Sequence, residues 1–475
     1  MGAGVMRVSV RDSLIVGAGV TMMAVLTVVS VGMGREMDIW VLLPAGLVVA
    51  VVAGWVALLA CAGEAWAMLA FLMVLVFVND ALFRQRQPGE LGLDWQNAMK
   101  FALWGLSWLI GVCNLSRSSA IWRGGAFMWL SIYLAYALLS SLYSAAPLYS
   151  FSTAFGLTGM ALFGAALAVT ATEKQILLSF ALSLFVYVLV GWVAYYAAPE
   201  IGRSLFITSH GTVVERMCGL AGQPNALGNG IAVLLALVYL LWLRGHIGLL
   251  GLLVMGGGGL FTLLVADSRT ALLAVMFGIV AVTLRRSVWL WGPAILGGCV
   301  LALAGLSIQL RDLMSLSGGL SRSGDATELF TLTGRTEIWE FAWDKIVLNP
   351  WIGYGYNSSK FILPDFDGLP GLKIDEAHNM LLQNLLAVGV VGTIPLVALL
   401  LNLIVDYVRA PDPRRDCFAF IILIWGITVA GPFGSTPTVM SLAVFCCMAL
   451  ARRDLPIPVA LRPVTLSYPH YRSIV

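Results

Sequence analysis

The stretch DEAHNMLLQNLLAVGVVG, residues 375–392, places titratable side chains at the entrance to a long apolar run. An imidazole with a pKa near 6.5 exchanges protons at neutral pH, so His378 could act as a general base. Asp375 or Glu376 could then hold its tautomer. The structural alternative makes Asp375 a helix cap and places His378 and Asn379 in a polar first turn. These residues alone leave both interpretations open.

Arg216 lies shortly before GLAGQPNALGNG, a segment that leads into another apolar run. A guanidinium beside the free N–H groups of a helix start can bind phosphate. Gly219, Gly222 and Gly228 would allow backbone or ligand to approach closely. The alternative is an arginine at the membrane interface that extends to lipid headgroups.

Two further arginines lie in polar segments next to apolar runs. Arg269, in ADSRTA, could bind an anion, or could cap the following helix together with Asp267. A charge between two membrane spans is costly and is a functional candidate for that reason. Arg335 precedes TEIWEFAWDKIVLNP, where it could bind an anion or pair with a glutamate of the same helix.

The composition indicates what surrounds these residues. The chain has 475 residues, of which 60% are hydrophobic and 11% charged, against about 25% charged in soluble proteins. This deficit predicts an all-α polytopic membrane protein. A net charge of +3 gives no reason to expect a nucleic-acid partner. The seven cysteines show no CxxC spacing and suggest neither disulfides nor a zinc site.

Runs of about 17–25 apolar residues can cross a bilayer, and we expect 12–14 such spans. MRVSVRD followed by a long apolar run reads as a retained first helix rather than a cleaved signal peptide. The candidate spans are 13–33, 39–62, 65–79, 97–115, 124–145, 150–171, 174–198, 226–243, 248–266, 270–284, 289–308, 379–405, 416–433 and 436–450.

The lysine and arginine bias of short loops predicts that both termini are cytoplasmic. The basic loops that lead to this topology are 116–123, 172–174, 243–246, 284–287, 408–416 and 451–454. We therefore expect a transmembrane bundle over 1–308, a large periplasmic loop over 309–377, C-terminal transmembrane helices over 378–453, and a cytoplasmic tail over 454–475.

The loop over 309–377 is predicted to be partly helical and to lie against the membrane face. Apolar residues at helical spacing predict an amphipathic helix over 336–350, ended by Pro350. These apolar residues are Ile338, Phe341, Trp343, Ile346 and Val347. In this topology the three arginines and His378 lie on the same, outer side. Arginine clusters suit diphosphates, and a nearby base suits activation of a hydroxyl.

Four motifs in order carry a resemblance to a known family: RMCGLAGQPNALGN, DSRTALLA, GRTEIWEFAWDKIVLNPWIGYGYNS and EAHNMLLQNLLAVGVVG. Over about residues 140–450 the chain resembles the O-antigen ligase and polysaccharide polymerase superfamily. These are bacterial inner-membrane glycosyltransferases of the GT-C type. The first hundred or so residues match only in hydropathy.

The resemblance implies a glycan donor on undecaprenyl diphosphate, presented on the periplasmic side, with no metal or cofactor required. Arg216, Arg269 and Arg335 would bind the diphosphate, and His378 would deprotonate the acceptor hydroxyl. Arg322, in SGGLSRSGD, has no motif partner and is an extra candidate. Possible supporting residues are Asp375, Glu376, Asn379, Tyr354 and Tyr356. Aromatic residues of the loop could stack on sugars or could simply pack, namely Trp339, Trp343, Trp351, Tyr354 and Tyr356.

Within this family a polymerase joins lipid-linked repeat units, whereas a ligase moves the finished glycan onto lipid A–core. The motifs GLAGQPNALGN and GRTEIW…GYGYNS resemble those of exopolysaccharide polymerases more than those of ligases, so we expect a polymerase. The ligase is the alternative, and a protein-targeted oligosaccharyltransferase is a remoter one. A transporter for the same lipid-linked glycan is the rival from a different class. Transporters carry ionisable groups near the membrane midplane and show repeated halves, neither of which is visible here.

Overall fold

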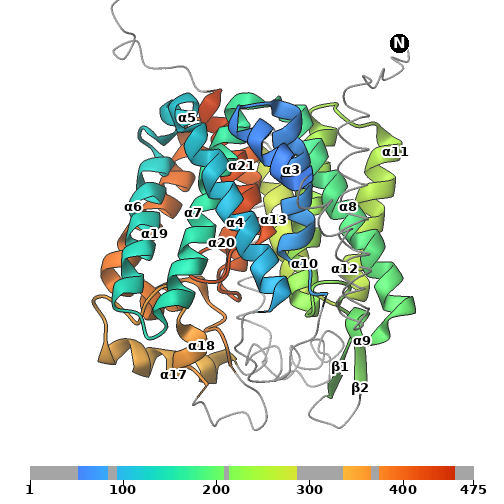
Figure 1. Ribbon diagram of the computed structural model, residues 1–475. Coiled ribbons are helices and arrows are strands. Elements are labelled where there is room, and N and C mark those ends of the chain that lie inside the picture. Colours follow the sequence, from blue (N-terminus) through green and yellow to red (C-terminus); the bar gives the residue numbers. More distant parts are fainter. Residues whose placement is uncertain (1–51, 84–93, 208–212, 286–334, 365–373, 455–475) are drawn as a thin grey trace, which may run out of the picture.

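The computed structural model describes residues 52–83, 94–207, 213–285, 335–364 and 374–454, which form a bundle of helices running between two ends (Figure 1). The labelled α-helices are α3 (Ala65–Asn79), α4 (Trp95–Cys113), α5 (Leu115–Trp122), α6 (Ala126–Leu139), α7 (Pro147–Thr170), α8 (Glu173–Ala197), α9 (Pro199–Gly202), α10 (Pro224–Leu243), α11 (Leu249–Gly251), α12 (Gly258–Val265), α13 (Arg269–Arg285), α17 (Arg335–Leu348), α18 (Ser359–Ile362), α19 (Met380–Arg409), α20 (Pro413–Trp425) and α21 (Val439–Arg453). Val52–Cys61 is also helical, and a π-helical turn, Leu252–Gly257, joins α11 to α12.

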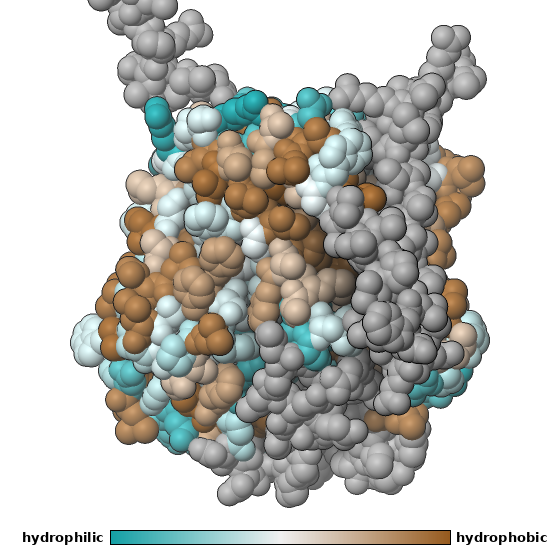
Figure 2. All heavy atoms as spheres, viewed as in Figure 1, coloured by the Kyte–Doolittle hydropathy of each residue, from teal (hydrophilic) through white to brown (hydrophobic). Residues whose placement is uncertain are grey.

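The length and composition of these helices confirm an all-α polytopic membrane protein. Among the described residues, α7, α8, α10 and α19 are long and apolar enough to cross a membrane, and α4 with α5 would form a fifth span bent by 85°. Figure 2 shows apolar side chains over the middle of one face, between polar side chains at its two ends. The expected spans 13–33 and 289–308 lie outside the described residues, so the total of 12–14 stays a prediction.

Two local features differ from the sequence-based expectation. An antiparallel hairpin of β1 (Arg203–Ile207) and β2 (Val213–Met217) precedes α10, where no strand was predicted. The span expected over 416–433 is also too long, because α20 ends at Trp425. An irregular segment rich in glycine and proline, residues 426–438, joins α20 to α21. We call this segment the α20–α21 linker.

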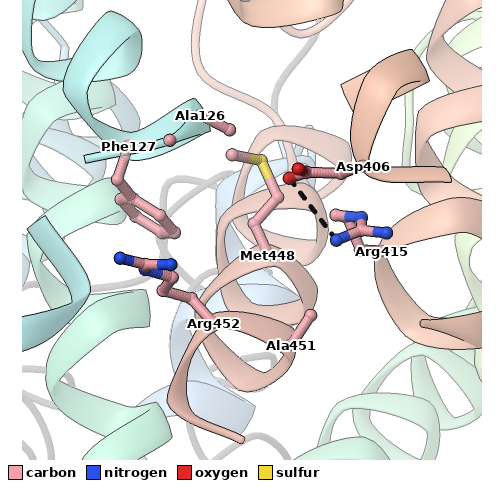
Figure 3. A pocket seen from close by; sticks show the side chains of 8 residues that line it. Ala126, Phe127, Asp406, Arg415, Met448, Ala451 and Arg452 are labelled. Atoms are coloured by element: carbon pink, nitrogen blue, oxygen red, sulfur yellow. Dashed lines mark ion pairs between the residues drawn. The ribbon is translucent and has the colours of Figure 1, made fainter. Parts of the chain in front are cut away.

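The basic loops predicted to be cytoplasmic meet at one end of the bundle. Arg414, only 2% exposed, pairs there with Glu173 at 2.7 Å, Asp454 at 2.7 Å and Asp412. These pairs join the start of α8, the start of α20 and the end of α21. Figure 3 shows a second pair at this end, Arg415 with Asp406 at 3.4 Å, beside a small pocket.

The opposite end of the bundle carries β1, β2, α17 and α18 (Figure 1). The predicted loop helix is confirmed as α17, which buries Ile338, Ala342 and Ile346 against a small apolar cluster that includes Leu386 of α19. Trp343 and Val347, expected in the buried stripe, are 52% and 59% exposed. The buried residues Ile338, Ala342 and Ile346 follow i, i+4, i+8 spacing, so Trp343 and Val347 face outwards.

Helix α19 is broken at Gly389, whose φ of 63° and ψ of −171° are not helical. The backbone groups left open by the break bond to the loop that follows α17 instead of to α19 itself. The four bonds run from Tyr354 N to Leu386 O (2.9 Å), Gly355 N to Ala387 O (2.7 Å), Val390 N to Pro350 O (2.8 Å) and Val391 N to Trp351 O (3.1 Å). We call residues 350–355 the bracing loop.

The break brings both arms of α19 against the same short stretch of α6. Tyr133 donates a 2.6 Å hydrogen bond to Asn384 in the first arm. Tyr136, three residues further along α6, lies against Gly392 in the second arm. In a straight helix, positions 384 and 392 would be separated by about 12 Å along the axis. The first arm therefore folds back against the bundle, and its N-terminal end carries His378.

Replacement of Gly389 by alanine should destabilise the protein severely. A Cβ at this position would lie 2.3 Å from the Trp351 carbonyl oxygen, and the backbone conformation itself favours glycine. Gly125 is a matched control, since its φ of 61° and ψ of −146° are similar and a Cβ there would meet nothing within 4 Å.

Thermal unfolding of both variants in detergent, followed by tryptophan fluorescence, separates the two effects. We expect Gly125→Ala to show only the conformational cost of about 1–3 kcal/mol, and Gly389→Ala to lose much more. Equal losses would mean that the bracing loop is not packed against the break.

Candidate functional site

His378 is the last residue but one before α19, and its backbone adopts a left-handed conformation with φ of 48°. Non-glycine residues in this region are uncommon and tend to occur at functional positions. On its C-terminal side, the Asn379 side chain accepts bonds from Leu381 N (3.0 Å) and Leu382 N (3.1 Å) and donates to Ile427 O. Asn379 rather than Asp375 is therefore the cap, and His378 and Asn379 precede the first turn of α19 instead of lying in it.

Gln383 fixes the chain on the N-terminal side of His378. Its fully buried amide accepts a bond from Ala377 N (2.9 Å) and donates to Ser359 Oγ (2.7 Å) and to Gly434 O (3.0 Å). The amide thereby joins residues 377–379, which we call the His378 segment, to α18 and to the α20–α21 linker. Sequence analysis did not select Gln383, although an amide inside an apolar run is a recognisable signal.

Asn384 extends this support, and it was also missed. Its buried amide accepts from Tyr133 and donates to Met380 O (2.8 Å) and Phe433 O (3.1 Å). Met380 N donates to Gly426 O at the end of α20. Since α20 has 13 residues, the start of α19 lies about 20 Å from the end of the bundle that carries Arg414 and Arg415, which we call the arginine-rich end.

The electrostatic surroundings keep the His378 imidazole neutral at neutral pH. Burial, and after it the positive charge of Arg335, lower the pKa of His378 to about 4. The Arg335 guanidinium, at the start of α17, is thus close enough to act on the imidazole. Burial, with the charge of Asp375, raises the pKa of Glu376 to about 7.

Among the described residues, neither Asp375 nor Glu376 makes a hydrogen bond to the His378 imidazole, so neither fixes its tautomer. No hydrogen bond between described residues involves the His378 imidazole. Asp375 is exposed, and its backbone carbonyl accepts from Ser359 Oγ at 2.8 Å. Among the described residues, no group thus occupies either imidazole nitrogen, and a general base needs one of them for the substrate proton.

Tyr354 and Tyr356 have structural contacts. The Tyr354 hydroxyl donates to Lys345 O at 2.9 Å. Tyr356 is fully buried, and its hydroxyl donates to Ser435 O of the α20–α21 linker at 2.8 Å. These contacts favour the packing interpretation for both tyrosines, whereas Trp343 and Trp351 are exposed.

Arg216 and Arg269 lie together at the corner between α12 and α13. Arg216 is 7% exposed and donates to Ala266 O through Nε (3.1 Å) and Nη2 (2.9 Å), and to Asp267 O through Nη2 (2.9 Å). It therefore binds the carbonyls at the end of α12, which was not foreseen. Gly228 allows this corner to pack closely on α10, because a Cβ there would lie 2.4 Å from Ser268 Oγ.

Arg269 is the first residue of α13, and its Nε lies 3.3 Å from Asp267 Oδ1. Its side chain is 39% exposed, unlike that of Arg216. α13 packs along α20, whose last turn leads to the Gly426 carbonyl that holds Met380. The corner between α12 and α13, where Arg216 and Arg269 lie, and the His378 segment are thus both packed against α20.

Arg322 lies outside the described residues. Within the described part of the chain, no three His, Cys, Asp or Glu side chains are grouped as metal ligands would be.

The fold defines a multi-pass membrane protein, with the candidate site near the end of the bundle that carries α17 and α18. Residues 250–397 match the family model described as O-antigen ligase. The matched segment contains Arg269, Arg335 and His378, and Arg216 lies outside it. The match bears out the resemblance to the O-antigen ligase and polymerase superfamily, and indicates a protein of this type in polysaccharide assembly. No curated protein matches the chain.

Loss of the Gln383 amide should impair the site more than it impairs the fold. Gln383→Met keeps a similar volume and removes three hydrogen bonds, so the backbone of His378 is no longer held. Gln96→Met is the control, because Gln96 is equally buried and accepts from Phe83 N elsewhere at this end.

Glycan transfer and thermal stability should be measured for both variants. Unsatisfied buried groups cost about 1–3 kcal/mol, so we expect both to lose stability and only Gln383→Met to lose transfer beyond that. Parallel losses of transfer and stability in the two variants would contradict a positioning role for Gln383.

Proposed function

We propose that this protein transfers a glycan from undecaprenyl diphosphate to a hydroxyl acceptor at the periplasmic face of a bacterial inner membrane. The observation that carries the proposal is His378, which has a left-handed backbone, no hydrogen bond from its imidazole to any described residue, and a pKa lowered by burial and by Arg335. Burial and strain of this kind are costly and persist where the surroundings fix them. The family match to residues 250–397 supports the same reaction class.

In the proposed reaction an imidazole nitrogen of His378 accepts the proton of the acceptor hydroxyl. The hydroxyl oxygen forms a bond to the anomeric carbon of the donor while the bond from that carbon to the diphosphate oxygen breaks. Direct displacement by one oxygen inverts the anomeric configuration. The diphosphate leaves with the electron pair, so guanidinium groups of Arg335 and Arg269 interact more strongly with it as the bond breaks.

Arg216 has a different role in this proposal. Its Nε and Nη2 are bonded to the carbonyls of Ala266 and Asp267, so it positions the turn that presents Arg269.

Arg335 also links donor binding to the basicity of His378. A base with a pKa of about 4 is weak at neutral pH, and the Arg335 charge is one of the two causes of this low value. A diphosphate bound to Arg335 would neutralise that charge and raise the pKa of His378. The base would thus become effective when the donor is in place.

We favour a polymerase, in which donor and acceptor are both lipid-linked, because the GLAGQPNALGN and GRTEIW…GYGYNS motifs resemble those of exopolysaccharide polymerases more than those of ligases. The description of the matching family as O-antigen ligase favours the second candidate, transfer to lipid A–core.

The pH dependence of transfer tests the coupling between Arg335 and His378. The base must be neutral, so activity is present above the His378 pKa and is lost as the pH falls through it. For kcat/KM with respect to donor, which reports the free enzyme, we expect the loss near pH 4. For kcat the loss should occur at higher pH, because the donor is then bound.

Arg335→Gln should shift the acidic limb of the kcat/KM profile to higher pH, because it removes the positive charge that lowers the pKa of His378. Lys345→Gln, on the same helix α17, is the control for loss of a positive charge and should leave the limb in place. A limb that does not move in Arg335→Gln would show that burial alone sets the His378 pKa.

Reconstitution of the purified protein with undecaprenyl-diphosphate repeat units tests the reaction itself. A glycan ladder from these units alone indicates a polymerase, and product that requires lipid A–core indicates a ligase. His378→Ala should reduce transfer by roughly 10²–10⁴-fold while donor binding is retained. His246→Ala is the control, because His246 lies beyond α10 at the arginine-rich end. Unchanged turnover in His378→Ala would exclude the base role.

A further inference from the structure

A cluster of polar and aromatic side chains lies beside the His378 segment and has no role in the reaction described above. It contains Tyr149 from the first turn of α7, Lys360 and Phe361 from α18, Asn357 just before α18, and Thr436 from the α20–α21 linker. We call these residues the Tyr149 cluster.

Hydrogen bonds hold the polar members of the cluster together. Asn357 Nδ2 donates to the Tyr149 hydroxyl (3.2 Å) and to Thr436 Oγ1 (3.1 Å), and the two hydroxyl oxygens are 3.3 Å apart. Asn357 is 4% exposed and has a left-handed φ of 55°. Three distant parts of the chain therefore converge on two hydroxyl groups that keep donor and acceptor capacity.

Lys360 supplies a positive charge to the cluster. Its Nζ lies 3.4 Å from the centroid of the Tyr149 ring and 5.4 Å from that of Phe361. The two rings meet edge to face, with centroids 5.5 Å apart. The ammonium group of Lys360 therefore has aromatic contacts, and no ion pair among the described residues involves it.

The Tyr149 cluster is connected to the His378 segment through Ser359 and Gln383. Ser359, the residue before Lys360, donates to the carbonyl of Asp375 (2.8 Å) and accepts from Gln383 Nε2 (2.7 Å). Gln383 in turn holds Ala377, the neighbour of His378. Two hydrogen bonds of Ser359 and one of Ala377 thus fix the cluster and the proposed base relative to each other.

Hydroxyl groups, an aromatic surface and one cation together suit a saccharide that carries a carboxylate. A sugar ring can pack on Phe361, which is 36% exposed, while its hydroxyls bond to Tyr149 and Thr436 and its carboxylate pairs with Lys360. A diphosphate would be better bound by arginines, so the cluster fits the acceptor rather than the leaving group.

We propose that the Tyr149 cluster is the acceptor subsite and that Lys360 selects an acidic sugar, one bearing a carboxylate, beside the reacting hydroxyl. The inference rests on the proposed glycan transfer and adds the chemical class of its acceptor.

Binding to the intact protein in nanodiscs tests this subsite without turnover. The probes are an oligogalacturonate and a neutral oligogalactoside of the same length, followed by saturation-transfer NMR or calorimetry. We expect the acidic probe to bind more tightly, and Lys360→Gln to weaken it roughly tenfold, as for one charge-assisted hydrogen bond, without affecting the neutral probe.

Lys345→Gln is a matched control, because Lys345 also lies over an aromatic ring, with Nζ 5.1 Å from Phe341, on the neighbouring helix α17. It should bind both probes like the unaltered protein. The inference is overturned if the unaltered protein does not distinguish the probes, or if Lys345→Gln and Lys360→Gln behave alike.

Nanodiscs with and without phosphatidylglycerol separate a sugar carboxylate from a lipid phosphate. If the preference for the acidic probe is lost when the nanodiscs contain phosphatidylglycerol, Lys360 binds lipid headgroups and the inference is overturned.

Transfer assays then separate the two proposals. Where transfer occurs, Lys360→Gln should raise the KM of an acidic acceptor and leave kcat and the donor KM unchanged. Selective binding without any transfer would retain an acidic-sugar site and refute the transferase. Transfer that is indifferent to Lys360 with either acceptor would refute this inference alone.

Discussion

The site depends on how a broken helix keeps its backbone hydrogen-bonded inside a membrane protein. Within a bilayer, open N–H and C=O groups find no water and must be satisfied by the protein. At Gly389 the bracing loop provides this, with two carbonyls for the second arm of α19 and two N–H groups for the first. Because the first arm is fixed in this way, its N-terminal residues, His378 and Asn379, have a defined place in the bundle.

The supporting interactions continue outwards from the first arm as a set of satisfied amides. Gln383 and Asn384 bond to α6, α18 and the α20–α21 linker as well as to the His378 segment. Asn79 holds the same linker from the other side, donating to Pro437 O at 2.9 Å while it accepts from Trp104. Buried amides with all their partners specify one arrangement of the surrounding segments, which the proposed role of His378 as a base requires.

The two ends of the bundle use charge in different ways. At the arginine-rich end, Arg414 is enclosed by three carboxylates and joins α8, α20 and α21. At the other end, among the described residues, the His378 imidazole has no hydrogen bond and Lys360 has no ion pair. A buried charge network stabilises the first end, whereas the second end has partly exposed pairs such as Arg269 with Asp267 in addition to His378 and Lys360.

The sequence was sufficient for the fold class and for α17, because composition and apolar spacing are local properties. It was not sufficient for the break in α19, since LLAVGVVG is apolar enough for an unbroken span and the bracing loop that stabilises the break lies some 35 residues earlier. The role of Arg216 could not be foreseen either, because its carbonyl partners are about 50 residues away along the chain. Gln383 and Asn384 were readable in principle, as adjacent amides in an apolar run.

The most direct test of the central claim is an experimental structure of the protein in nanodiscs with an undecaprenyl-diphosphate saccharide bound. The account predicts the diphosphate beside Arg269 and Arg335, with the anomeric carbon facing His378 across space for one hydroxyl. A diphosphate bound at the arginine-rich end, or a saccharide turned away from His378, would contradict it.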